Sequence, residues 1–121
     1  MNDLANRRIL VVEDEVMIAM MIEGMLTDLG CEIVGPASKL EDAIALAAGE
    51  ALDAALLDVT IRGGQVFPVA EILRGRSIPF ALASGYGDWA LPEAFQGSPR
   101  LQKPFTAAAL EAALGAICPP R

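Results

Sequence analysis

The feature that most constrains the fold is a set of short apolar runs that each end abruptly at a polar residue. Three of them are rich in aliphatic residues, and they occupy residues 8–12, 53–58 and 78–83. Their polar ends are the acidic run Glu13-Asp14-Glu15, Asp58 and Ser84. Runs of this length and composition are typical of strands that are buried on both faces of a sheet.

Helical patterns follow the first runs. Between Glu15 and Leu29 the apolar residues recur at helical spacing, and Gly30 follows as a C-terminal stop. We interpret Met17, Met20, Met21 and Met25 as helix and core fillers. A short strand is expected at residues 31–34, before a glycine and a proline, and the capping box from Ser38 to Glu41 predicts a helix through Ala48.

The second half of the chain continues the alternation. A loop is expected from Val59 to Gly64, and a helix then extends to Leu73 with Pro68 in its first turn. Residues 87–97 are ambiguous, with a helix of one or two turns from Pro92 through Phe95. A short strand at residues 101–102 precedes a helix that is capped by Thr106.

Five strands alternating with five helices predict a parallel sheet that is covered by helices on both faces. Residues 1–121 are therefore expected to form a single domain. In such sheets ligands bind where the carboxyl ends of the strands meet. The polar residues Glu13, Asp14, Asp58, Ser84 and Lys103 all follow strands, so we expect them at one edge.

Composition excludes several classes of protein. The net charge is −7, there is no histidine, and basic residues cluster only at Arg7-Arg8, which argues against nucleic-acid binding. The longest apolar stretch, Val16 to Ile22, is far shorter than a membrane span, and the absence of a secretory signal favours a cytoplasmic location. Cys31 and Cys118 lack metal-ligand spacing and are interpreted as reduced core residues.

The predicted edge carries the groups of a phosphoryl site. Three carboxylates would repel one another unless a cation lies between them, and oxygen ligands without histidine favour Mg²⁺. Lys103 supplies a positive charge and Ser84 a hydroxyl for an incoming anion. Asp58, alone at the end of the central strand, is the best nucleophile for an aspartyl phosphate, with Glu13 and Asp14 as a metal-binding pair.

This set of residues resembles the receiver domain of bacterial response regulators over essentially the whole chain. The matching features are an acidic pair after strand one, an aspartate after strand three, Ser/Thr after strand four, and Lys-Pro after strand five. The stretch 79–86, Pro-Phe-Ala-Leu-Ala-Ser-Gly-Tyr, is further similar to the FAT GUY subset of single-domain receivers, with Leu-Ala-Ser in place of Phe-Ala-Thr.

The resemblance implies a flavodoxin-like strand order of 2-1-3-4-5. It also implies that Asp58 takes a phosphoryl group from a histidine on a sensor histidine kinase or phosphotransfer protein. Mg²⁺ would be held by Glu13, Asp14, Asp58 and the backbone carbonyl of Thr60, and the phosphoryl oxygens would be bound by Ser84 and Lys103.

The chain departs from the family at one position. Most receivers carry Tyr or Phe three residues before the lysine, and this chain has Arg100 there. We therefore hypothesise that residues 85–100, with their three glycines, carry the conformational response.

The function expected from the sequence is a phosphoacceptor signalling module that is not a turnover enzyme and acts on an unknown downstream protein. Three alternatives remain. An aspartyl-phosphate phosphatase needs a second aspartate two residues after the nucleophile, where this chain has Thr60. A nucleotide-binding module needs a Gly-rich loop after strand one, which is absent. The last is a receiver-like scaffold that is never phosphorylated.

Overall fold

A computed structural model describes residues 4–85 and 91–119 and contains a parallel five-stranded sheet. Its order is β2-β1-β3-β6-β7, and every neighbouring pair in it is parallel. When these five strands are counted along the chain, this is the predicted order 2-1-3-4-5, which is confirmed. The strands are β1 (Arg8–Val12), β2 (Glu32–Ala37), β3 (Ala54–Asp58), β6 (Phe80–Ser84) and β7 (Arg100–Gln102).

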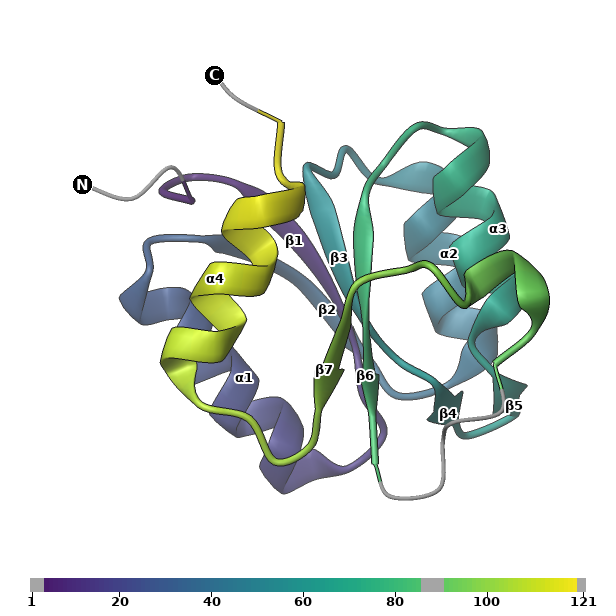
Figure 1. The fold of residues 1–121 in the computed structure, drawn as a ribbon, viewed down its shortest axis with the longest axis horizontal. Helices are drawn as coiled ribbons and strands as arrows, with labels where there is room; N and C mark the ends of the chain where they lie inside the picture. Colours follow the sequence, from purple (N-terminus) through teal and green to yellow (C-terminus); the bar gives the residue numbers. More distant parts are fainter. Residues whose placement is uncertain (1–3, 86–90, 120–121) are drawn as a thin grey trace.

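Helices cover both faces of the sheet, as the alternating pattern predicts (Figure 1). On one face α1 (Val16–Asp28) and α4 (Ala107–Ile117) pack against the sheet through side chains such as Leu26 and Leu110. On the other face lie α2 (Leu40–Gly49) and α3 (Phe67–Gly75). The central strand β3 is buried at every position, so it has helices above and below it.

The edge strand β2 is longer than expected and corrects the prediction of residues 31–34. It continues through Gly35 and Pro36 to Ala37, because a proline without an N–H is tolerated on an edge strand. Gly35 has a φ of 100°, and a Cβ there would lie 2.8 Å from the Ala37 nitrogen and 2.9 Å from the Val11 oxygen. Glycine is therefore required at this irregular point in the pairing with β1.

The loop predicted at residues 59–64 contains a small hairpin instead. Its strands are β4 (Thr60–Ile61) and β5 (Gly64–Gln65), which pair antiparallel. Gly63 at the turn has a φ of 99°, a conformation that glycine adopts without strain. Two-residue strands carry too little periodic pattern to be recognised from sequence.

The described part of the ambiguous segment, residues 91–97, contains one 3₁₀ turn, η1 (Glu93–Phe95), which begins after Pro92 as predicted. Phe95 is buried, and its ring stacks on Phe67 at a centroid distance of 5.1 Å. The guanidinium of Arg74 lies 4.6 Å from the Phe95 ring centroid. The hypothesis that residues 85–100 carry the conformational response falls partly on residues 86–90, which lie outside the described residues.

Two further expectations are wrong and one is confirmed. The capping box at Ser38 does not form, because the N-cap of α2 is Lys39 and it has no side-chain cap bond. Met17, Met20 and Met21 are exposed and do not fill the core. Thr106 caps α4, since its hydroxyl accepts a hydrogen bond from the Ala109 N–H at 3.1 Å.

Within the described residues, no helix combines the length and the apolar character that crossing a membrane requires. Cys31 and Cys118 are both half-buried and pack against the core on the α1 and α4 side of the sheet, as expected for core-type cysteines.

Candidate functional site

The strand ends bring the predicted site residues to one edge of the sheet. Glu13 follows β1, Asp58 is the last residue of β3, Ser84 is the last residue of β6, and Lys103 follows β7. The backbone N–H of Lys103 donates to the Ser84 carbonyl at 2.8 Å, which extends the pairing of β6 and β7 to this edge. Parallel pairing places these ends together although the residues are far apart in sequence.

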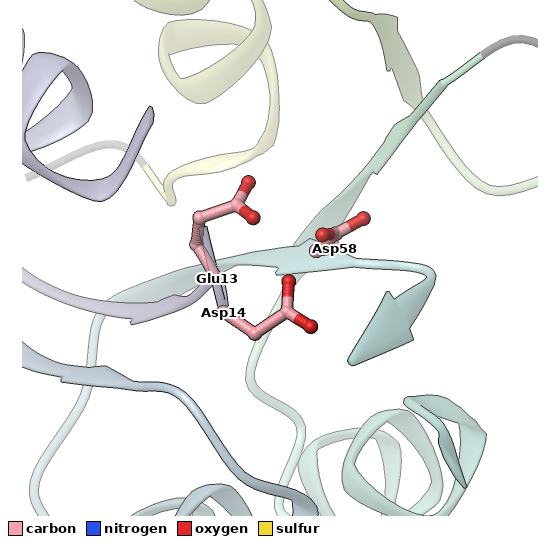
Figure 2. A group of neighbouring side chains, drawn as sticks. All are labelled: Glu13, Asp14 and Asp58. Atoms are coloured by element: carbon pink, nitrogen blue, oxygen red, sulfur yellow. The ribbon is translucent and has the colours of Figure 1, made fainter. Parts of the chain in front are cut away.

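Three carboxylates form the acidic part of the site (Figure 2). Glu13, Asp14 and Asp58 each offer a carboxylate oxygen, and these oxygens lie within 4.8 Å of one another. Glu13 and Asp58 are only 2% and 6% exposed, whereas Asp14 is half-buried. Glu13 is also held by local contacts, since its Oε2 accepts from the Glu15 N–H at 3.2 Å.

Lys103 joins two of these carboxylates. Its Nζ lies 2.6 Å from Glu13 Oε1 and 2.9 Å from Asp58 Oδ2. The lysine side chain is 15% exposed, so both ion pairs are largely withdrawn from water. In the protein without a phosphoryl group, the ammonium is therefore the counter-charge of the carboxylates themselves.

Burial and the close pairing of charges shift the pKa values of both Asp58 and Lys103. Burial raises the pKa of Asp58 to about 7, and the neighbouring Glu13 carboxyl adds to the increase while Lys103 opposes it. Burial by itself would lower the pKa of Lys103, but its ion pairs with Glu13 and Asp58 outweigh this effect and raise it. The ammonium is thus held charged beside an unusually basic aspartate.

The donor set fits a hard divalent cation. When Asp58 is ionised, the three carboxylates carry more negative charge than the single ammonium compensates. All of the clustered donors are carboxylate oxygens, the ligand type that Mg²⁺ prefers. The grouping of Glu13, Asp14 and Asp58 is therefore chemically suited to hold one.

Thr60 and Ser84 reach the same edge but stand apart from the ion-pair cluster. Thr60 begins the β4–β5 hairpin two residues after Asp58, and its side chain is exposed. Ser84 lies one residue beyond Ala83, the register partner of Asp58 on the neighbouring strand, and is buried. The structure thus brings Glu13, Asp14, Asp58 and Lys103 together and places the other two residues beside them.

Sequence reasoning missed the double ion pair of Lys103 and the exposure of part of helix α1. The sequence assigns Lys103 only to an incoming anion, and no pattern in a sequence reports which carboxylates it contacts before that anion arrives. The exposure of three methionines does have a signal in the sequence. Met17, Met20 and Met21 fall outside the apolar stripe that contains Ile22 and Leu26.

Comparison with known proteins places the chain in a family. The chain is similar to SdrG of Sphingomonas melonis Fr1, with 44% identity and a TM-score of 0.82 over 96% of this chain and 98% of that one. It is also similar to a response regulator receiver protein of Sinorhizobium medicae WSM419, with 28% identity and a TM-score of 0.77 over 94% and 95% of the two chains. The chain belongs to the receiver-domain family of response regulators.

One curated relative extends beyond this receiver domain. The transcriptional regulatory protein PdtaR of Mycobacterium tuberculosis is 33% identical over 88 residues, which are 72% of this chain and 43% of PdtaR. The chain thus matches less than half the length of PdtaR. No protein-family model matches the chain.

Membership of the family assigns the general activity. SdrG has a second structure, in its BeF3-activated conformation, which is 45% identical to this chain with a TM-score of 0.75 over 91% and 97% of the two chains. Receiver domains are phosphoacceptor modules of two-component signalling that interact with histidine kinases and downstream proteins. The chain is such a phosphoacceptor signalling module.

Proposed function

We propose that Asp58 accepts a phosphoryl group from a histidine on a sensor histidine kinase or phosphotransfer protein. The observation that supports this most directly is the position of its carboxylate. It lies at the edge where the strands end, beside the carboxylates of Glu13 and Asp14 and 2.9 Å from the Lys103 ammonium. A buried carboxylate that contacts an ammonium and also belongs to a candidate metal site is suited to become an aspartyl phosphate.

Mg²⁺ is the cofactor that this donor set fits, held by Glu13, Asp14, Asp58 and the backbone carbonyl of Thr60. When bound, the ion neutralises charge on the phosphoryl oxygens. Lys103 supplies a second positive charge to those oxygens, and Ser84 supplies a hydroxyl donor. Both roles are consistent with their places at the ends of the two strands beyond β3.

The transfer itself exchanges one bond for another. A carboxylate oxygen of Asp58 forms a bond to phosphorus as the bond between phosphorus and the donor histidine nitrogen breaks, and the electron pair returns to the imidazole. Lys103 then exchanges a contact with the Asp58 carboxylate for one with the phosphoryl group. Glu13 stays beside Lys103 and preserves part of its pairing.

The module is proposed to signal by contact with a downstream protein or by passing the phosphoryl group on, and not as a turnover enzyme. Residues 1–121 would act as one receiver domain in the cytoplasm, without nucleic acid or a membrane as a partner. The acidic net charge of −7 is in keeping with a protein partner and disfavours nucleic acid.

The test is phosphorylation by a small donor. The purified chain is incubated with acetyl phosphate and Mg²⁺, and intact mass is measured. We expect a gain of one phosphoryl group that is absent in Asp58→Asn and absent in EDTA. If the wild-type chain gains nothing from this donor or from any kinase, it is a scaffold; sustained hydrolysis of phosphomonoesters would instead indicate a phosphatase.

A further inference from the structure

Two basic side chains, Lys39 and Arg62, lie side by side on the surface of the molecule. The two residues form an isolated parallel β-bridge, and the Leu40 N–H donates to the Arg62 carbonyl at 2.9 Å. Residues that are directly opposite in such a bridge carry their side chains on the same side. Lys39 and Arg62 are both exposed, and we call them the basic pair.

The basic pair has no internal counter-charge. Within residues 4–85 and 91–119, neither of its side chains has a hydrogen bond or an ion pair. The carboxylates of Glu41 and Asp42, which follow on α2, are not paired with it in this part of the chain either. Unpaired cations on a chain of net charge −7 are available to an external anion.

Both members of the basic pair adjoin the phosphoacceptor site. Arg62 follows Asp58 by four residues, so their Cα atoms are at most about 14 Å apart. The β4–β5 hairpin lies at the end of β3 that carries Asp58 (Figure 1). Lys39 follows Ser38, which lines the same hollow as Asp14. Charges at this range are only partly screened, since the screening length is about 10 Å at 0.1 M salt.

The backbone holds the basic pair in a fixed place. Ile61, beside Arg62, is 4% exposed and packs into the core. The Val66 N–H donates to the Val59 carbonyl at 2.9 Å and closes the base of the hairpin. Because the bond between Leu40 and Arg62 joins the hairpin to the start of α2, the two cations are presented together and not on independent loops.

The surroundings of Asp58 oppose the approach of a free anion. Glu13 and Asp14 add two carboxylates, and Lys103 is already paired with Glu13 and Asp58. An acyl phosphate carries two negative charges, so a nearby pair of unpaired cations raises its concentration at this edge of the sheet. A donor protein, in contrast, is positioned by a contact surface of many residues.

We propose that the basic pair attracts small acyl phosphates to Asp58 and so sets how readily the chain is loaded without a kinase. The transfer forms a bond from a carboxylate oxygen of Asp58 to phosphorus. It breaks the bond from phosphorus to the acyl oxygen, which leaves as a carboxylate with the electron pair. The basic pair binds the donor and takes no part in this bond exchange. The inference rests on the proposed function of Asp58 and adds a substrate class for the same site.

The test separates attraction of the donor from transfer. The rate of loading is measured by intact mass against the concentration of acetyl phosphate in Mg²⁺, and phosphoramidate serves as a second donor with a smaller net charge. The variant Lys39→Gln/Arg62→Gln removes both charges, and Lys39→Arg/Arg62→Lys keeps them. Ala112→Glu/Ala116→Glu is the matched control, because it changes the net charge equally at exposed positions in the second half of α4.

The glutamine variant should load from acetyl phosphate about fivefold more slowly at low donor concentration and low salt, because the dianion is no longer attracted. The loss should appear as a higher KM with an unchanged maximal rate, since the basic pair acts on binding. It should shrink to about twofold with phosphoramidate and vanish at about 0.5 M salt. The charge-keeping variant and the α4 control should stay within about twofold of wild type.

Equal loading of the glutamine variant and wild type at low salt would overturn the inference. A loss that persists at high salt, that lies in the maximal rate, or that the α4 control shares would overturn it as well. Failure of the wild-type chain to load from either donor would instead count against the proposed function of Asp58 itself. The two failures are therefore distinguishable.

Discussion

At the scale of single residues, one ammonium is shared by two buried carboxylates that lie at the ends of different strands. Lys103 Nζ is 2.6 Å from Glu13 and 2.9 Å from Asp58, and all three side chains are largely removed from water. Removing one member of such a group leaves a buried charge without its partner, which costs more than an exposed ion pair contributes. The site is therefore sensitive both to substitution and to protonation.

Lys103→Met should destabilise the metal-free protein, because Glu13 and Asp58 then remain buried without their ammonium. Urea denaturation in EDTA at pH 8 should show a free energy of unfolding lower by about 3 kcal/mol. Mg²⁺ should restore part of this loss, since a cation replaces the missing charge. Lys39→Met, which changes an exposed lysine, is the control; an equal effect in both variants would contradict the role of the ion pairs.

The raised pKa of Asp58 predicts a pH dependence of stability. Its pKa is about 7 in the folded chain and about 4 in an unfolded one, so between these values the folded state holds a proton that the unfolded state has lost. This group therefore makes the metal-free protein less stable as pH rises from about 4 to 7, and the effect levels off above the folded pKa.

Asp58→Asn isolates that contribution from those of the other acidic groups. In EDTA, the stability of the variant relative to wild type should increase as pH is raised from 5 to 8. Thermal denaturation at several pH values measures the difference. A difference that stays constant over this range would show that Asp58 has an ordinary pKa.

At the scale of elements, the strands of the main sheet and the helices were predictable, whereas the hairpin and the full length of β2 were not. The five sheet strands followed from the runs that end at polar residues. The end of α1 followed from the glycine stop at Gly30, and the start of α4 followed from the cap at Thr106. The β4–β5 hairpin was not predictable, because two residues per strand show no alternation. The extension of β2 past Pro36 depended on its being an edge strand, which is a property of the assembled sheet.

Substitution by alanine is expected to have opposite effects on stability at two glycines, Gly24 and Gly35. Gly24 lies in α1, and a Cβ there would meet nothing within 4 Å, so Gly24→Ala should stabilise the chain by about 0.5–1 kcal/mol. Gly35→Ala should destabilise it by about 2 kcal/mol, because φ is 100° and the backbone lies within 3 Å. Urea denaturation measures both; an equal sign for the two substitutions would contradict these assignments.

At the scale of the whole molecule, the sheet gathers groups that are up to 90 residues apart in sequence onto one edge, from Glu13 to Lys103. This gathering was predictable, because the ends of parallel strands meet whatever the side chains between them are. The finer arrangement was not predictable. The packing of all the layers decides which oxygens lie within reach of Lys103 and how deeply each of them is buried. This gathering concentrates negative charge at one edge of the sheet. The binding of a cation there can be measured.

Mg²⁺ should stabilise the whole domain by binding at this edge in the folded state alone. At a concentration about 100 times its dissociation constant, the gain in the free energy of unfolding should be about 2.7 kcal/mol. The gain should be larger at pH 8 than at pH 5.5, because below its pKa of about 7 Asp58 binds a proton that competes with the cation.

Thermal denaturation against Mg²⁺ concentration measures this stabilisation. The variants Glu13→Gln and Asp58→Asn should each weaken the response. Equal stabilisation of both variants and of wild type would mean that the cation binds elsewhere on this acidic surface.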